Sequence, residues 1–342
     1  MRIHTDRSAP LSAVTVDAPA RLHMGFLDPS GSLGRSFGSI GLAIDGRGTR
    51  VCARLADNMQ VVRAQSDAQR VRIEQYLERL HAAWGGPPLA IDVEQAPRSH
   101  CGLGSGTQLA LALGTAYARL AGVPASTDAI ARLLGRGGRS GIGALSFDHG
   151  GLLVDGGPAR AHDHGRGMPP LLFRQPFPDA WRVVLVDDLS REGLHGEEER
   201  RGLAALPPFP QTLAAHLCHL VLMRVLPGVA EHDFDAFADG ISAVQQTIGE
   251  YFAPVQGGVY SSPAVARAMQ AIAQGQRAAL GQTSWGPTGF AIVRSAELAE
   301  RALADARAAS RDAVSLTFAI TQARNRGAAQ SVEHARCGVD VG

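Results

Sequence analysis

Alternation of apolar and polar residues predicts short strands along the chain, because successive side chains of a strand point to opposite faces. The segments that alternate, or that form short apolar runs between turn residues, are 13–19, 50–64, 89–95, 181–186, 290–293 and 313–320. We expect Pro19 to end the first strand, since proline removes a hydrogen bond from the ladder.

Apolar residues at a spacing of three and four predict helices between these strands. The predicted helices are 68–84, 108–120, 126–135, 211–226, 233–250, 263–274 and 296–309. Ser126 or Thr127 is a suitable N-cap for the third of them. Strands and helices are interspersed without a regular βαβ rhythm, which favours an α+β fold over a doubly wound sheet.

Two domains are expected for a chain of 342 residues, because a single hydrophobic core stops growing near ~250–300 residues. Residues 158–178 are rich in proline, glycine, histidine and arginine, and they are the predicted linker. We therefore place an N-terminal domain at residues 1–170, a C-terminal domain at 180–325 and a flexible tail at 326–342.

Composition narrows the class of ligand. The apolar fraction of 45% and the charged fraction of 19% are typical of a globular protein. The net charge of +1 provides no field to attract nucleic acid or an anionic membrane, so neither is an expected partner. All 33 basic residues are arginine. We therefore expect anions to be held by arginine side chains, backbone N–H groups and helix N-termini.

Cysteine usage and the N-terminal sequence indicate a cytoplasmic protein. The four cysteines are scattered without the spacing of a zinc site, which is typical of reduced thiols. The first residues lack the apolar segment of a signal peptide, and no run approaches the ~18 apolar residues of a membrane span.

A glycine-rich loop at residues 102–107, with the sequence GLGSGT, directly precedes the predicted helix 108–120. Glycines let the backbone turn tightly and approach a ligand closely. The start of the helix adds unpaired N–H groups and the positive end of its dipole. The combination favours a phosphate or diphosphate site, although a plain strand-to-helix turn has the same pattern. The loop is neither a Walker A motif nor a dinucleotide fingerprint.

Three motifs in order resemble those of the GHMP kinase superfamily. The loop within residues 97–107 is similar to its second motif, residues 18–25 (APARLHMG) to its first, and residues 282–289 (QTSWGPTG) to its third. The resemblance spans almost the whole chain. It implies an N-terminal domain like ribosomal protein S5 domain 2 and a ferredoxin-like C-terminal domain.

Within that superfamily the amino-acid sequence more closely resembles the β-ribofuranosylaminobenzene 5′-phosphate synthase branch. The segments that carry this resemblance are PARLHMGFLD, GRSGIGALSFDHGGLLVDGG, GLHGEEE and TSWGPTGFAIV. It implies that phosphoribosyl pyrophosphate condenses with 4-aminobenzoate, or 4-hydroxybenzoate in some relatives, and releases CO2 and pyrophosphate. The resemblance places this reaction in tetrahydromethanopterin biosynthesis, and it implies Mg2+ as the counter-ion of the donor.

An ATP-dependent small-molecule kinase is the alternative function. Many kinases of the superfamily carry a catalytic Asp in a segment P-S-G-I-D, whereas this chain has Gly143 at the end of the equivalent segment 139–143. A kinase of that type would lack its general base, which weakens this alternative. A non-catalytic relative is disfavoured by the density of glycine and arginine at the motifs.

Candidate site residues follow from these motifs. We expect diphosphate or 5′-phosphate to be bound by the loop residues together with three arginines and nearby hydroxyls, namely Gly102, Gly104, Ser105, Gly106, Thr107, Arg21, Arg35, Arg139, Ser140, Ser284 and Thr288. Asp28, Arg35 and Arg21 are the expected catalytic residues. Asp28 and Glu197 are the expected metal ligands, and Trp285 is expected to stack on the aromatic acid.

Structural roles remain open for several of these residues. Asp28 precedes Pro29 and also fits a plain turn. Arg21 and Arg35 also fit surface ion pairs, and Trp285 also fits a core position. Asp187, at the end of an apolar strand, resembles the acidic pair of type I phosphoribosyltransferases, but no phosphate loop follows it. The apolar helices of the C-terminal half favour a homodimer.

Overall fold

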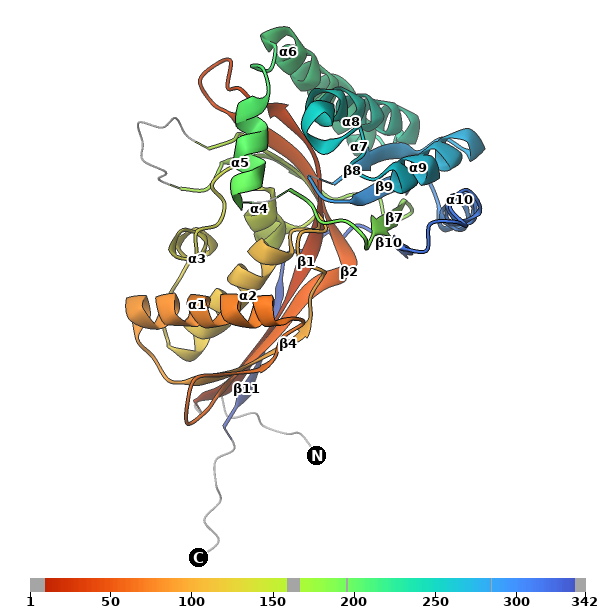
Figure 1. Ribbon diagram of the computed structural model, residues 1–342. Helices are drawn as coiled ribbons and strands as arrows, with labels where there is room; N and C mark the ends of the chain where they lie inside the picture. Colours follow the sequence, from red (N-terminus) through yellow and green to blue (C-terminus); the bar gives the residue numbers. More distant parts are fainter. Residues whose placement is uncertain (1–9, 159–166, 195, 284, 336–342) are drawn as a thin grey trace, which may run out of the picture.

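The computed structural model describes residues 10–158, 167–194, 196–283 and 285–335. Its helices and strands form two layered units (Figure 1). The first unit contains β1 (Leu11–Asp28), β2 (Phe37–Leu55), β3 (Gln60–Arg63), α1 (Asp67–Trp84), β4 (Leu89–Gln95), α2 (Ser105–Leu120), α3 (Thr127–Leu133), α4 (Ile142–His149), β5 (Leu152–Asp155) and β6 (Leu171–Gln175).

The second unit follows in sequence. It contains β7 (Arg182–Asp188), α5 (Gly196–Ala205), α6 (Gln211–Leu220), the π-helix η2 (Val221–Val225), α7 (Leu226–Ala230), α8 (Phe234–Gln256), α9 (Pro263–Gly275), β8 (Ala279–Gln282), β9 (Thr288–Val293), α10 (Ala296–Ala308) and β10 (Leu316–Thr321). The last strand, β11 (Ala329–His334), returns to the first unit, where it pairs antiparallel with β1.

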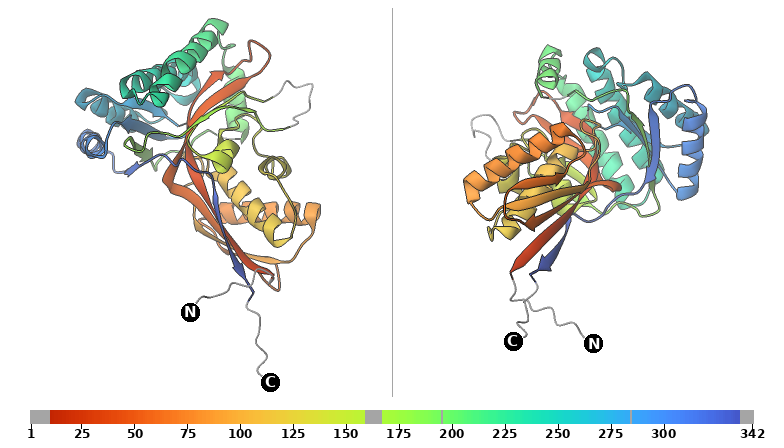
Figure 2. Two further views of the ribbon diagram at one scale, coloured as in Figure 1. Left: turned by 180° about the vertical axis from the view of Figure 1, so that it is seen from behind. Right: turned by 60° about the horizontal axis from the view of Figure 1, so that its bottom comes forward.

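The N-terminal sheet has the order β11-β1-β2-β4-β3, with β5 on β2 and β6 on β5. The long pair β1 and β2 runs through the molecule from the chain ends to the helices of the second unit (Figures 1 and 2). Helices α1 and α2 cover one face of its lower half, and their apolar residues share a core with those of β1, β2 and β4. The helical residues of α2 are buried almost all round, as an Ala/Leu-rich sequence predicts.

The C-terminal sheet is antiparallel, with the order β10-β7-β9-β8. Taken in chain order, its four strands lie 4-1-3-2, which is the ferredoxin-like arrangement that the resemblance implies. Side chains of β7 alternate between two cores: Val183 and Leu185 pack with α8, whereas Val184 and Val186 pack with α9 and α10. Helix α8 therefore lies between this sheet and the upper half of β1, and so connects the two units.

Several boundaries differ from the predicted ones. Pro19 does not end β1, because a register shift between Ala18 and Ala20 accommodates the missing N–H within a continuous strand. The predicted strand 50–64 is the end of β2 plus the separate β3. The helical segment predicted at 211–226 continues to Ala230 through η2 and α7.

The predicted linker and tail are partly structured. Residues 171–175 form β6, so the N-terminal sheet extends past the predicted boundary at residue 170. The prediction of a flexible segment from residue 326 is wrong for residues 329–334, which form β11. Their polar sequence gives no apolar alternation, because all six residues of this edge strand are exposed.

Candidate active site

A cavity of about 730 Å3 lies at the junction of the two units. Its wall comes from β1, the loop before α2, the loop between α3 and α4, the start of α5 and the loop before β9. The lining includes Arg21, His23, Phe26, Arg72, His100, Gly102, Gly104, Ser105, Gly106, Thr107, Arg136, Arg139, Ser140, Glu199, Trp285 and Gly286. Most of the sequence-predicted loop residues are therefore brought together here.

The glycine-rich loop adopts a shape that other residues would not permit. Gly102 and Gly104 have φ angles of 91° and 81°, in the left-handed region. A Cβ at Gly102 would lie 2.4 Å from the carbonyl oxygen of Thr283, so the loop packs directly on the segment before β9. The Thr283 hydroxyl donates to the carbonyl of Gly102 (2.8 Å) and accepts from the backbone N–H of His23 (2.9 Å). This hydroxyl therefore connects the loop to β1.

Arg21 lies beside Gly104, where a Cβ would come within 3.1 Å of the Arg21 side chain. Its Nη1 donates to the carbonyl of Gly102 at 2.5 Å, and its Nε has no hydrogen-bond partner among the described residues. Burial lowers the pKa of Arg21 to about 10, so the guanidinium stays charged at neutral pH. The cation and the first turn of α2 therefore face the same space.

Three further arginines line the cavity, and the only carboxylate among its described lining residues is that of Glu199. Arg139 forms a bidentate ion pair with Glu199, with N–O distances of 2.5 and 2.8 Å. Arg136 donates from Nε to the Tyr76 hydroxyl at 3.0 Å, and Arg72 comes from α1. The excess of cationic groups makes the cavity suitable for a multiply charged anion.

A buried carboxylate shapes the rim next to α4. Asp155 accepts hydrogen bonds from the backbone N–H groups of Gly141 and Gly157 and from the Ser140 hydroxyl. Burial raises the pKa of Asp155. Arg35 donates to the carbonyl of Gly157 at 2.8 Å, and it does not line the cavity.

The deep wall is aromatic and uncharged. His23 is 3% exposed, and burial, assisted by the nearby Arg21, lowers its pKa to about 3, so its imidazole is neutral. Trp285 is 6% exposed, and its ring lies 4.4 Å from that of Phe252. Neither His23 Nε2 nor Trp285 Nε1 has a hydrogen-bond partner among the described residues.

Gly143 lies in the first turn of α4, directly behind the loop. A Cβ at this position would be 3.0 Å from Cγ2 of Thr107, which lines the cavity. The carbonyl of Gly143 accepts from the Gln108 side chain at 2.7 Å. The position that corresponds to the kinase Asp is therefore next to the glycine-rich loop, and the close packing against Thr107 favours glycine there.

Several predicted site residues lie elsewhere. The Asp28 carboxylate accepts from the N–H groups of Gly31 and Ser32 and from the Ser32 hydroxyl, so it caps the turn after β1 and does not line the cavity. The Thr288 hydroxyl contacts the carbonyl of Cys101 and the carboxylate of Asp187, which is a structural contact with the loop. Glu197 is exposed outside the cavity, and Ser284 lies outside the described residues.

Sequence reasoning missed Arg72, Arg136, His100 and Glu199. Arg136 belongs to the glycine-rich segment 135–143, which is a signal that points to it. Glu199 is the third member of an acidic run at 197–199, and only the α-helical phase of α5 selects it. Nothing in the local sequence of α1 marks Arg72.

Preformed metal sites are absent from the described residues, among which no group of three His, Cys, Asp or Glu side chains converges. Of the described residues that line the cavity, Glu199 alone carries a carboxylate, and it is paired with Arg139. The described residues thus do not fit a metal site built by the protein alone. One helical segment, Gln211–Ala230, is long and apolar enough to span a membrane, a test that core helices also pass.

Comparison with known proteins agrees with the fold. The GHMP kinases N terminal domain matches residues 72–151, and the GHMP kinases C terminal domain matches residues 225–312. A mevalonate diphosphate decarboxylase structure from Staphylococcus aureus superposes with a TM-score of 0.64 at 13% identity, covering 94% of this chain and 98% of that one. A homoserine kinase structure from Cytophaga hutchinsonii gives a TM-score of 0.61 at 14% identity, covering 97% and 100%. At these identities the structures show the fold alone.

Sequence relatives are more specific. The beta-ribofuranosylphenol 5′-phosphate synthase of Archaeoglobus fulgidus is 35% identical over 325 residues, which cover 90% of this chain and 96% of that protein. The synthase of the same name from Methanocaldococcus jannaschii is 30% identical over 261 residues, covering 67% and 76%. The predicted fold and branch are thereby confirmed. The chain has the GHMP-kinase fold and belongs to the family of beta-ribofuranosylphenol 5′-phosphate synthases.

Proposed function

We propose that the protein is a decarboxylating phosphoribosyl C-transferase of tetrahydromethanopterin biosynthesis. Its donor is phosphoribosyl pyrophosphate, and its acceptor is a benzoate with an electron-donating para group, either 4-aminobenzoate or 4-hydroxybenzoate. The observation that carries the proposal is a cavity whose described lining has four arginines, one carboxylate and an uncharged aromatic wall. Family membership supplies the class of reaction.

The arginines and the start of α2 would bind the donor. Its diphosphate fits the loop at Gly104–Thr107, where Arg21 adds a buried positive charge. Arg72, Arg136 and Arg139 lie along the same cavity and suit the second anionic group, the 5′-phosphate. Holding both ends fixes the anomeric carbon between them.

Departure of pyrophosphate generates positive charge on the ribose ring, and the protein must stabilise the leaving group without repelling the ribose. The arginines stabilise the departing anion. His23 is neutral, so it adds no charge beside the developing cation, and the ring faces of Phe26 and Trp285 exclude water from it.

Charge balance explains the missing acid at position 143. The ring carbon that bears the carboxylate forms a bond to the anomeric carbon, and the bond from that carbon to the pyrophosphate oxygen breaks. The bond to the carboxylate then breaks, its electron pair returns to the ring, and CO2 leaves. The negative charge of the carboxylate ends on pyrophosphate, so no proton has to be removed from either substrate. A kinase, in contrast, must remove a hydroxyl proton.

We propose that Mg2+ enters the cavity bound to the donor, because phosphate oxygens are its preferred ligands and the described residues offer Glu199 alone in the cavity. The ion would supply further neutralisation of the leaving group, and no step above depends on it. Isothermal titration of the donor with and without Mg2+ tests this proposal, and equal affinities would contradict it.

Location and assembly are also proposals. We propose a cytoplasmic homodimer in which the apolar face of η2, where Leu222 and Met223 are 63% and 62% exposed, contacts a second copy. Light scattering of the purified protein tests it. A monomer mass at micromolar concentration would contradict the dimer.

Product analysis decides between the transferase and the kinase. The purified protein is incubated with phosphoribosyl pyrophosphate and each benzoate, and separately with ATP and a panel of small alcohols. We expect a C-riboside phosphate in the first case and no phosphoryl transfer in the second. Phosphoryl transfer without any C-riboside would replace the transferase by the kinase alternative.

A further inference from the structure

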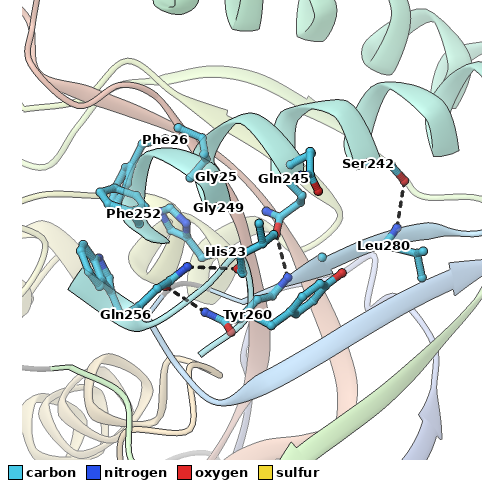
Figure 3. A pocket seen from close by; sticks show the side chains of 16 residues that line it. His23, Gly25, Phe26, Ser242, Gln245, Gly249, Phe252, Gln256, Tyr260 and Leu280 are labelled. Carbon is cyan, nitrogen blue, oxygen red and sulfur yellow. Dashed lines mark hydrogen bonds between the residues drawn. The ribbon is translucent and has the colours of Figure 1, made fainter. Parts of the chain in front are cut away.

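Behind the arginine-lined cavity lies a second, smaller one of about 150 Å3 (Figure 3). It is enclosed between β1, helix α8 and strand β8. His23, Phe26 and Trp285 line both cavities and therefore lie where the two meet; they are called the shared wall. In Figure 3, Phe26 of β1 lies beside Phe252 of α8, and His23 of β1 lies near Gly249 of the same helix.

The volume of the inner cavity suits one aromatic ring, since a cavity of about 150 Å3 in another protein holds benzene. Its apolar lining comes from Phe26, Ile248, Phe252, Val259 and Trp285, which matches the flat faces of such a ring. Glycines keep the space open on two sides. A Cβ at Gly25 would lie 3.1 Å from Val244, and one at Gly281 would lie 2.3 Å from Gln245.

The polar lining of the inner cavity is neutral. It includes Ser242, four glutamines, Tyr260 and the neutral His23, and among the described residues no Asp, Glu, Lys or Arg lines this cavity. Gln245 accepts from the backbone N–H of Gln282 at 2.7 Å, and the Gln282 side chain donates to Gln256 at 3.3 Å. These bonds hold the amides in fixed positions. There they can form hydrogen bonds to a neutral group, whereas a charged group would lose its hydration without an opposite charge to pair with.

Two polar atoms at the shared wall lack partners. His23 Nε2 and Trp285 Nε1 belong to side chains that are 3% and 6% exposed, and neither has a hydrogen-bond partner among the described residues. Buried polar atoms without a partner are rare in native proteins, so both atoms call for a partner, which a bound ligand or a water supplies. Both residues line the inner and the outer cavity, as a ligand that joins the two would require.

We propose that the inner cavity is the acceptor subsite, in which the benzoate ring packs against the contacting rings of Phe252 and Trp285 with its para group toward the glutamines. This inference rests on the proposed function. The carbon that bears the carboxylate then faces the outer cavity, where the anomeric carbon of the donor lies. The carboxylate sits at the wall with the two unpartnered atoms, and a hydroxyl or amino group fits the neutral interior.

Acceptor selectivity follows from this geometry. The enzyme accepts benzoates whose para group is small and neutral, and it rejects terephthalate, which has the same shape but adds a second carboxylate to a neutral cavity. It also rejects 4-hydroxy-3,5-dimethylbenzoate, since two added methyl groups exceed the space for one ring.

The test combines binding and kinetics on the full chain. Binding of 4-hydroxybenzoate without donor is followed by intrinsic fluorescence, with Trp285→Phe as the variant that removes the signal from the shared wall. Terephthalate should bind at least about 100-fold more weakly than 4-hydroxybenzoate, because its second carboxylate would be desolvated without a partner. Equal binding of the two would overturn the subsite.

Ile248→Phe narrows the inner cavity without touching the outer one. We expect KM for the acceptor to rise about 10-fold or more while KM for the donor stays within about 2-fold. An unchanged acceptor KM, or an equal rise for both substrates, would overturn the subsite while the proposed function stands. If the unaltered enzyme forms no C-riboside with any benzoate, the proposed function itself fails. Should the variant not fold, the terephthalate comparison decides.

Discussion

Substituting Gly143 with the acid found in kinases probes why this chain has glycine there. The variants are Gly143→Asp and its neutral isostere Gly143→Asn. In both, the new Cβ lies 3.0 Å from Thr107 Cγ2, so both should lose about 1–3 kcal/mol of stability through overpacking. The steric cost is common to the two variants, and their difference therefore isolates the charge.

The magnitude follows from the position of Thr107 on the cavity wall. Two unit charges about 6 Å apart interact by roughly 3 kcal/mol at an effective dielectric constant of about 20. An aspartate beside a bound diphosphate should therefore raise KM for phosphoribosyl pyrophosphate about 100-fold above that of the asparagine variant. Pairing of the new carboxylate with the arginines would also raise KM for phosphoribosyl pyrophosphate, because it would occupy the cations that bind the donor.

The assay measures release of labelled CO2 against donor concentration for both variants, with unfolding in urea as the control for stability. We expect kcat to fall or stay constant and no ATP-dependent phosphorylation to emerge. Equal donor KM values for the two variants would refute the placement of the diphosphate. A higher kcat for the aspartate variant would refute the argument that no proton has to be removed.

Four further changes test other parts of the account. Arg136→Ala should raise the donor KM about 10–100-fold, and less at high salt, because it removes a charged hydrogen-bond donor; a KM without salt dependence would contradict this. Glu199→Gln frees Arg139 from its ion pair and should lower the donor KM in initial-rate kinetics, so a higher KM would assign Glu199 a direct role in binding the donor. The depressed pKa of His23 implies that the unfolded chain binds a proton that the folded one does not between about pH 3 and 6.5, so stability falls as pH falls through that window, and His23→Gln should flatten the urea-unfolding profile there. Truncation after Gly327 removes β11 from β1 and should lower the thermal midpoint by several degrees, whereas an unchanged midpoint would show that the strand is dispensable.

Much of the fold could be predicted from the sequence, since the apolar periodicity of α1, α2, α8 and α10 is strong. The N-cap of α3 was predicted at Ser126 or Thr127, and in the structure it is the Ser126 hydroxyl that accepts from the N–H of Ala129. β11 could not be found, because an edge strand with no buried residue carries no hydrophobic pattern. Pro19 was misleading because β1 continues through it with a register shift at that same position, between Ala18 and Ala20.

The site residues also differ in how far the sequence could predict them. The glycine loop could be predicted because glycine at a helix start has a backbone consequence that the sequence displays, and Arg21 was predicted because it lies in the segment 18–25 that resembles the first family motif. Asp28 and Thr288 were predicted for the site, but a carboxylate or hydroxyl serves a structural hydrogen bond as well as a ligand. The structure places Asp28 in a local turn and Thr288 in hydrogen bonds to Cys101 and Asp187. Arg72 and Glu199 reach the cavity through helix position alone, which composition does not reveal.

The most direct test of the central claim is the stoichiometry of the reaction. Purified protein is incubated with phosphoribosyl pyrophosphate and carboxyl-labelled 4-hydroxybenzoate or 4-aminobenzoate, and labelled CO2 and pyrophosphate are measured in the same samples. The account predicts equal amounts of the two products, each dependent on both substrates. Pyrophosphate without CO2, or no release with either benzoate, would contradict it.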